Sequence, residues 1–402
     1  MDQPVRRIGV FTSGGDAPGM NAAIRAVTRA AIYNGFDVKG IMRGYKGLIT
    51  DEIIPFQTQN VSNIIQQGGT ILKTARCEEF RTPEGRKIAY DNIIKHGISA
   101  LVVIGGDGSL TGARIFASEY NFPIVGVPGT IDNDLFGTDH CPGYASAAKY
   151  VATSCAEVYK DAHVYDTGMI VIIEIMGRHA GWLTAASSLA NISGEGPDLI
   201  YLPERDFDLN KFVEDVKAVY ARSGKCIAAV SEGIHDSTGK LIAEYGAENA
   251  PVDAFGHKQL GGLASYLANY IKGTLGCKVR GIEFSLMQRC GAHLASLTDI
   301  QESFLSGKTA VLEAISGTTD KMVGFERKYA EKGSYVCGIK LMNLTDVANT
   351  EKKVPLEWIN REGNNVNKEF IDYALPLIQG TPDRPLENGL PRFARLKKIQ
   401  AK

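Results

Sequence analysis

The feature that most constrains this fold is an alternation of short apolar runs with segments of helical period. Residues 7–13, 98–106 and 122–129 read RIGVFTS, ISALVVIGG and FPIVGVPG, and the first two lead through a glycine-rich turn into a helical segment. This alternation predicts βα units and a mostly parallel, buried sheet. A second series that begins near residue 150 predicts another α/β layer. Residues 321–329 and 333–341 predict a hairpin around Glu331-Lys332-Gly333.

Length and charge limit the function classes. A chain of 402 residues suggests roughly two to three domains, and 44 Lys and Arg against 45 Asp and Glu give no bulk attraction to nucleic acid or to a membrane. The N-terminus has no apolar signal core and the apolar runs are short, so we expect a cytoplasmic protein. Seven cysteines without a C-x-x-C pair predict reduced thiols rather than disulfides or a zinc site.

Three predicted strand ends carry the chemistry, because ligands bind beyond the carboxyl ends of parallel strands. Residues 12–21 (TSGGDAPGMN) free backbone N–H groups for an anion, although a plain turn fits equally well. In residues 102–112 (VVIGGDGSLTG), Ser109 is predicted to cap the following helix. Asp107 is then either an N-cap or a ligand for a hard cation such as Mg²⁺.

The third strand end is residues 127–139 (VPGTIDNDLFGTD), where Pro128-Gly129 predicts a loop. Asp132 and Asp134 can both point from it into one cleft, as proton acceptor and as metal or structural partner. The alternative is an Asx-turn with solvated acids. Arginines match phosphate oxygens, although a lone arginine is more often a surface ion-pair partner. Four arginines lie close to a glycine or a strand end: Arg76, Arg178, Arg280 and Arg289.

Taken together, the motifs resemble the phosphofructokinase family. TSGGDAPGMNAAIR, GGDGS, PGTIDND, MGRHAGW, SEGIH and QR occur in the family's order between residues 12 and 289. The resemblance implies two three-layer α/β (Rossmann-like) domains with the active site between them. It implies a phosphate-donor domain at residues 1–143 plus about 288–345, a fructose 6-phosphate domain at about 144–287, and a C-terminal extension at about 346–402.

The resemblance also implies the reaction, which is transfer of a phosphoryl group from ATP to the 1-hydroxyl of fructose 6-phosphate in glycolysis. Asp132 would be the general base. Gly15, Arg76 and Thr130 would hold the transferring group, and Asp107 would bind Mg²⁺. The donor would be bound by Gly15, Tyr45, Arg76, Cys77, Gly106, Asp107, Gly108, Ser109 and Gly112. The sugar phosphate would be bound by Thr130, Asp132, Asp134, Met176, Gly177, Arg178, Glu232, Arg280 and Arg289. Because the family supplies Arg280 from a neighbouring subunit, a homodimer or homotetramer is expected.

The donor depends on two glycines. Relatives that use pyrophosphate typically have Asp where this chain has Gly108 and Lys where it has Gly129, so ATP is favoured. A pyrophosphate donor is the alternative, since the C-terminal extension resembles the longer, often pyrophosphate-linked branches. Met169 and Leu286 replace an arginine and a histidine of the short bacterial enzymes in the 6-phosphate pocket.

Three other functions fit the sequence less well. GGDGS also resembles a turn of NAD and diacylglycerol kinases, but PGTIDND and MGRHAGW are not part of those patterns. A non-catalytic sugar-phosphate or nucleotide sensor would not need Asp132, Arg76 and Asp107 together. A Rossmann dehydrogenase is disfavoured because G-x-G-x-x-G does not follow the first strand.

Overall fold

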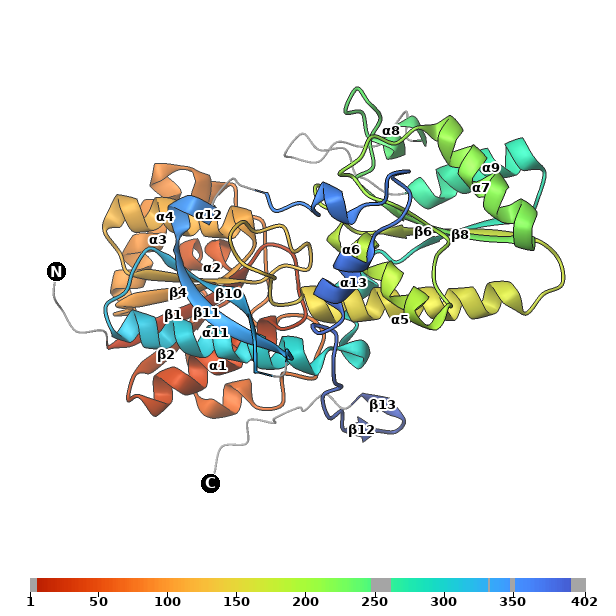
Figure 1. Cartoon of the computed structure of the whole chain (residues 1–402). Coiled ribbons are helices and arrows are strands. Elements are labelled where there is room, and N and C mark those ends of the chain that lie inside the picture. The colour runs from red at the N-terminus through yellow and green to blue at the C-terminus, as the bar shows by residue number, and fades with distance from the viewer. Residues whose placement is uncertain (1–5, 247–261, 332, 348–350, 392–402) are drawn as a thin grey trace.

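The computed structural model describes residues 6–246, 262–331, 333–347 and 351–391. It contains two large sheets, each with helices on both faces (Figure 1). The predicted α/β class is therefore confirmed. The strand interiors are almost completely buried, as expected for parallel strands that are covered on both sides.

The larger sheet is mostly parallel, with one antiparallel strand at each edge. The central part of this sheet consists of four parallel strand pairs: β2 with β1, β1 with β4, β4 with β5, and β5 with β10. In spatial order the strands are β11 (Tyr335–Asn343), β10 (Lys321–Tyr329), β5 (Ile124–Pro128), β4 (Ala100–Gly105), β1 (Arg7–Ser13), β2 (Asp37–Ile41) and β3 (Ile53–Phe56). The predicted hairpin is β10–β11, and Lys332 of its predicted turn lies outside the described residues.

Side-chain alternation along β4 divides the core around this sheet. Val102 and Ile104 join the cluster beneath α1, whereas Leu101 and Val103 join the cluster on the opposite face. The first face is covered by α1 (Met20–Tyr33) and α11 (Leu297–Ile315), and the second by α2 (Tyr45–Ile49), α3 (Pro83–Lys95), α4 (Asp107–Tyr120) and α12 (Leu344–Val347).

The smaller sheet is entirely parallel, and its strands follow one another as β7 (Leu199–Tyr201), β8 (Lys225–Ser231), β6 (Met169–Ile175) and β9 (Val279–Glu283). One face is covered by α7 (Leu209–Ser223), α8 (Ile242–Gly246) and α9 (Leu263–Leu275), and the other by α5 (Tyr144–His163) and α6 (Trp182–Ala186). The edge strand β9 is largely exposed.

The C-terminal chain runs from α12, beside the larger sheet, to α13 (Lys368–Ala374), beside the smaller one (Figure 1). The predicted irregular tail contains one small ladder, β12 (Leu386–Glu387) with β13 (Leu390–Pro391). The short remaining elements are α10 (Met287–Cys290), η1 (Thr58–Val61), η2 (Glu79–Arg81), η3 (Ser187–Ser193), η4 (Ala292–Leu294) and η5 (Leu356–Trp358). In the described part of the chain, no helix is long and apolar enough to cross a membrane.

The strands change sheet twice along the chain. Strands β1 to β5 belong to the larger sheet, β6 to β9 to the smaller one, and β10 and β11 to the larger one again. Helix α11, which precedes β10, already packs on α1. The residue limits given above for the two domains and for the C-terminal extension stay predictions.

Candidate active site

The three chemistry-bearing turns lie side by side because their strands are neighbours in register. Ser13 of β1 pairs with Gly105 of β4, and Gly105 pairs with Pro128 of β5. The Gly129 N–H donates to the Gly105 carbonyl at 3.0 Å, which joins the second and third turns directly. Segments that are separated along the chain therefore form one edge of the sheet, as expected for the carboxyl ends of parallel strands.

These turns surround a cleft of about 680 Å³, a volume in the usual range for small-molecule sites. Most of the predicted donor and catalytic residues line it. They are Gly15, Tyr45, Arg76, Cys77, Gly106, Asp107, Gly108, Ser109, Thr130, Asp132, Asp134 and Arg289. Gly112 lies directly behind this wall, because a Cβ at that position would be 3.1 Å from the Tyr45 hydroxyl.

The first turn of α4 differs from the prediction in one respect. The helix begins at Asp107 with Gly106 as its N-cap, so Ser109 is inside the helix and the predicted cap at Ser109 is wrong. Ser109 is buried, and its carbonyl accepts a hydrogen bond from the Tyr45 hydroxyl at 2.6 Å. The cap is therefore three residues earlier than predicted and Asp107 is the first residue of the helix, where a negative charge interacts favourably with the positive helix end.

An aromatic pair packs against the first turns of α4 beside the cleft. Tyr45 stacks on Phe80 with ring centroids 4.0 Å apart, and its hydroxyl is fixed on Ser109. Burial raises the pKa of Tyr45 and, to a lesser degree, that of the Cys77 thiol. Cys77 therefore stays protonated near neutral pH and contributes to the cleft as a small apolar side chain rather than as a nucleophile.

The aspartate loop, residues 130–139, carries the two acids predicted from the sequence. The Asp132 N–H donates to the Thr130 hydroxyl at 3.1 Å, which fixes the start of the loop. Burial raises the pKa of Asp132 to about 6, while the charge of Arg289 opposes this rise. Burial, and then the charge of Asp132, raise the pKa of Asp134 to about 6. A carboxylate with a pKa near 6 is a suitable proton acceptor at neutral pH.

Arg289 connects the two halves of the candidate site. A Cβ at Gly15 would lie 3.7 Å from its guanidinium carbon, and its charge lowers the pKa values of Asp16, Asp132 and Glu232 against the larger effect of burial. Its guanidinium therefore lies among a donor-side glycine and acids of both sheets. The family resemblance implied a role for Arg289 only in binding the sugar phosphate.

The predicted sugar residues of the smaller sheet gather at the carboxyl ends of β6 and β8. The Gly177 N–H donates to a Glu232 carboxylate oxygen at 3.4 Å, and the charges of Arg178 and Arg289 both act on that carboxylate. Gly177 has a φ of +144°, and a Cβ there would lie 2.7 Å from the Ala180 carbonyl, so only glycine fits without strain. These residues and Met176 lie outside the lining of the cleft.

Arg280 also lies outside the lining of the cleft. It lies on β9, the edge strand of the smaller sheet, and it is exposed. That Arg280 contributes to the sugar-phosphate site of a neighbouring subunit stays a prediction.

The charge of the cleft suits a divalent cation. Its lining contains five carboxylates, of Asp16, Glu78, Asp107, Asp132 and Asp134, and three guanidiniums, of Arg76, Arg81 and Arg289. Phosphate groups alone would be repelled by this acidic excess. Asp107 and Asp134 are close enough for their charges to interact, and carboxylate oxygens are the ligands that Mg²⁺ prefers. The residues present therefore fit Mg²⁺ held mainly by Asp107 together with substrate phosphates.

Sequence reasoning missed several residues that shape the cleft. The Asp16 carboxylate accepts from the Thr70 N–H at 2.9 Å, and the Thr74 hydroxyl donates to the Gly14 carbonyl at 2.6 Å, so residues 70–74 hold the first turn in place. Arg81 also lines the cleft. Asp16 lies inside a motif that was singled out, but the irregular stretch around Thr74 carries no comparable signal.

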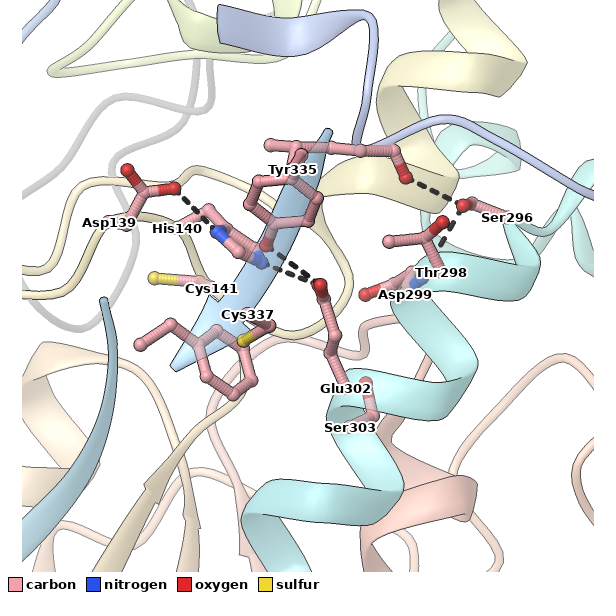
Figure 2. Close-up of polar contacts among 12 residues, drawn as sticks. Asp139, His140, Cys141, Ser296, Thr298, Asp299, Glu302, Ser303, Tyr335 and Cys337 are labelled. Carbon is pink, nitrogen blue, oxygen red and sulfur yellow. Dashed lines mark hydrogen bonds and ion pairs between the residues drawn. The ribbon is translucent and has the colours of Figure 1, made fainter. Parts of the chain in front are cut away.

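A second titratable cluster lies outside the cleft, behind the aspartate loop (Figure 2). His140, Glu302 and Cys337 offer ligand atoms within 4.8 Å of one another. Both ring nitrogens of His140 are already hydrogen-bonded, to Asp139 at 2.8 Å and to Glu302 at 2.7 Å. Burial lowers the pKa of His140, but these two hydrogen bonds outweigh it and raise the pKa above its ordinary value. The cluster is thus stabilised by its own ion pairs.

Known proteins resemble about two thirds of the chain in sequence and nearly all of it in structure. A sequence model of the family described as Phosphofructokinase matches residues 7–282. ATP-dependent 6-phosphofructokinase 2 of Bacteroides thetaiotaomicron is 50% identical over 264 residues, 64% of this chain and 79% of that protein. ATP-dependent 6-phosphofructokinase of Halalkalibacterium halodurans is 44% identical over 277 residues, 68% and 85% of the two chains. The crystal structure of pyrophosphate-dependent phosphofructokinase from Marinobacter aquaeolei is 31% identical with a TM-score of 0.85, covering 99% and 98%. The chain belongs to the phosphofructokinase family.

Proposed function

We propose that this chain is an ATP-dependent 6-phosphofructokinase, which transfers the γ-phosphoryl group of ATP to the 1-hydroxyl of fructose 6-phosphate. The observation that carries the proposal is the juxtaposition of Asp132, Asp107 and Arg289 around one cleft. It places a proton acceptor, a cation ligand and an anion-binding cation together, which are the parts that phosphoryl transfer requires.

In the proposed mechanism, Asp132 accepts the proton of the sugar hydroxyl as that oxygen attacks the phosphoryl group. The oxygens of the transferring phosphoryl group are bound by the Gly15 N–H, Arg76 and Thr130. The hydrogen-bond donors of these residues thus face the negative charge that develops on those oxygens. Asp107 would hold Mg²⁺, which would supply positive charge to neutralise the phosphate oxygens. Glu232 accepts a hydrogen bond from a sugar hydroxyl, next to Gly177 and Arg178.

ATP is proposed as the donor because of the space beside two glycines. A Cβ at Gly108 would have nothing within 4 Å, so the absence of a side chain leaves the start of α4 open to the cleft. A Cβ at Gly129 would lie 3.1 Å from Ile104 and 3.4 Å from Met20, so a lysine would have to displace packed side chains. The relatives at 50% and 44% identity are both named ATP-dependent.

Pyrophosphate is the second candidate donor, because two structures that match nearly the whole chain are named pyrophosphate-dependent. They come from Marinobacter aquaeolei and from Nitrosospira multiformis, the latter 28% identical with a TM-score of 0.87. Initial rates of fructose 1,6-bisphosphate formation with ATP and with pyrophosphate, on one purified sample, decide between the two. Turnover with pyrophosphate equal to or faster than with ATP would overturn the ATP assignment.

Assembly and location are proposed in the same way. The exposed edge strand β9 carries Arg280, which is accessible to a second subunit, so we propose a homodimer or a homotetramer. Light scattering during size-exclusion chromatography measures the subunit number, and a monomer would contradict the proposal. All seven cysteines are free, which is compatible with a cytoplasmic enzyme.

A further inference from the structure

The aspartate loop is held from behind by the C-terminal segment, residues 351–379. The Lys352 N–H donates to the Asp134 carbonyl at 2.7 Å, and Leu135 forms an antiparallel bridge with Glu351. The main chain of this segment therefore pairs with the main chain of the loop directly after the two acids. The family match ends at residue 282, so this C-terminal segment lies outside the part of the chain that the family model describes.

The ammonium group of Lys352 lies beneath the same loop. It donates to the Asn133 side-chain oxygen at 3.2 Å, the Thr138 carbonyl at 3.2 Å and the Asp139 carbonyl at 2.7 Å. An ammonium group has three N–H donors, and here all three have an acceptor. Because the acceptors come from both ends of the loop, one side chain fixes its curvature.

Asn133 gives this contact a direct link to the catalytic geometry. It lies between Asp132 and Asp134 and has a φ of +55°, a conformation that is costly for a non-glycine residue unless its surroundings hold it. Its side-chain oxygen accepts from Lys352 and from the Cys141 N–H, and its side-chain nitrogen donates to the Tyr373 hydroxyl. The backbone turn that sets the directions of both acids is therefore fixed by two residues of the C-terminal segment.

Lys352 also contacts the sugar side of the candidate site. Its carbonyl accepts from the Trp182 indole N–H at 2.8 Å, and its ammonium lies 4.9 Å from the centre of that ring. Two residues later, the Val354 N–H donates to the Glu204 carboxylate oxygen that also accepts from the Gly181 N–H. Gly181 and Trp182 end the loop that begins with the predicted sugar ligands Met176, Gly177 and Arg178.

The far end of the aspartate loop has a further anchor besides Lys352. Arg327 forms two hydrogen bonds with the Asp139 carboxylate, at 3.0 and 3.1 Å, and Asp139 is bonded in turn to His140 (Figure 2). Burial acts to raise the pKa of Asp139, but its hydrogen bonds with His140 and Arg327 lower it to about 2. Residue 139 is thus a rigid end point, and the part of the loop that carries the acids depends on Lys352.

We propose that Lys352 is a positioning residue for phosphoryl transfer. It ties the loop that carries the general base Asp132 to the loop that binds the sugar, and so sets the separation between the base and the acceptor hydroxyl. This inference rests on the proposed function, and it assigns a role to the C-terminal extension. Positioning of this kind changes rates strongly, because proton transfer requires hydrogen-bond distance between the base and the hydroxyl.

Lys352→Met tests the proposal, because methionine keeps an unbranched side chain out to the Cε position but lacks the ammonium group and its N–H donors. We expect kcat to fall at least tenfold and the KM for fructose 6-phosphate to rise several-fold, while the KM for ATP changes less than twofold. The exposed neighbour Lys353 supplies the matched control, and Lys353→Met should retain wild-type values. Trp182→Phe removes the indole donor to the Lys352 carbonyl and shortens the ring beside its ammonium, and it should also raise the KM for the sugar more than that for ATP.

The outcomes separate the two proposals. If wild type and Lys353→Met do not form fructose 1,6-bisphosphate, the proposed function is wrong and the role of Lys352 fails with it. If both are active and Lys352→Met matches them, only the positioning role is overturned. A loss of kcat in proportion to the unfolded fraction, measured by circular dichroism, with both KM values unchanged, would show a purely structural role and would also overturn it.

Discussion

Gly108→Asp tests the donor assignment at a position of the cleft that has open space for a side chain. Gly108 is the second residue of α4, its φ is not in the left-handed region, and a Cβ there would contact nothing within 4 Å. The new carboxylate therefore fits without steric strain. An acid in the first helical turn and the removal of a helical glycine both favour the folded helix, by about 0.3–1 kcal/mol each. Any loss of activity thus comes from charge rather than from misfolding.

The magnitude follows from Coulomb's law. Two unit charges about 4 Å apart, at an effective dielectric constant of about 20, repel by about 4 kcal/mol. Mg²⁺ on Asp107 and the nearby arginines offset part of this repulsion, so we expect a net cost of about 1.4–2.8 kcal/mol. That cost corresponds to a fall of about 10-fold to 100-fold in kcat/KM for ATP.

The assay couples fructose 1,6-bisphosphate formation to NADH oxidation, with ATP or pyrophosphate as donor. Gly108→Ala is the matched control, because it adds the Cβ without the charge, and it should remain within about threefold of wild type. The melting temperature of both variants should equal or exceed that of wild type. An ATP kcat/KM for Gly108→Asp within twofold of that for Gly108→Ala, or an equal loss with both donors, would refute the reasoning.

Three further predictions concern the acids and the aromatic pair. Asp132→Asn should lower kcat at least a hundredfold with fructose 6-phosphate binding largely retained, measured by initial rates and calorimetry; near-normal turnover would exclude the base role. Burial raises the pKa values of Asp132 and Asp134 to about 6, so both carboxylates are increasingly protonated below that pH. We therefore expect kcat at pH 5 to be at most about a tenth of kcat at pH 7, and a flat profile of kcat against pH would contradict this. Tyr45→Phe removes one buried hydrogen bond and should lower the free energy of unfolding in urea by about 1 kcal/mol while stacking on Phe80 and most activity remain; an unchanged urea midpoint would argue against the bond to Ser109.

Local features of the candidate site were predictable from the sequence. The glycine turns after β1 and β4, and the acid-rich loop after β5, are encoded by neighbouring residues, because strand-to-helix turns need glycine and parallel strands need continuous apolar runs. The predicted cap at Ser109 failed at this same local level. Gly106 is the N-cap although it has no side chain to accept a hydrogen bond, and α4 therefore begins at Asp107. The hydrophobic periodicity does not distinguish a helix that begins there from one capped by Ser109.

Longer-range relations were only partly predictable. The residue types of Arg289 and Glu232 suggested sugar binding, but the position of Arg289 beside both Gly15 and Asp132 depends on how α10 follows β9. Asp16 and Thr74 were missed because their contacts join a motif to an irregular segment. Irregular segments have no hydrophobic periodicity from which their position could be predicted.

The sequence by itself determined the α/β class, the family and the set of polar groups at the strand ends. These follow from periodicity and turn chemistry, which act over a few residues. Only the tertiary structure decided how the acids are held. Lys352 reaches Asn133 across 219 residues of chain, and its three acceptors are two backbone carbonyls and an amide oxygen, which no residue pattern near Lys352 reveals. Contacts of this kind depend on packing that brings distant segments together, and so they exist only once the whole chain has folded.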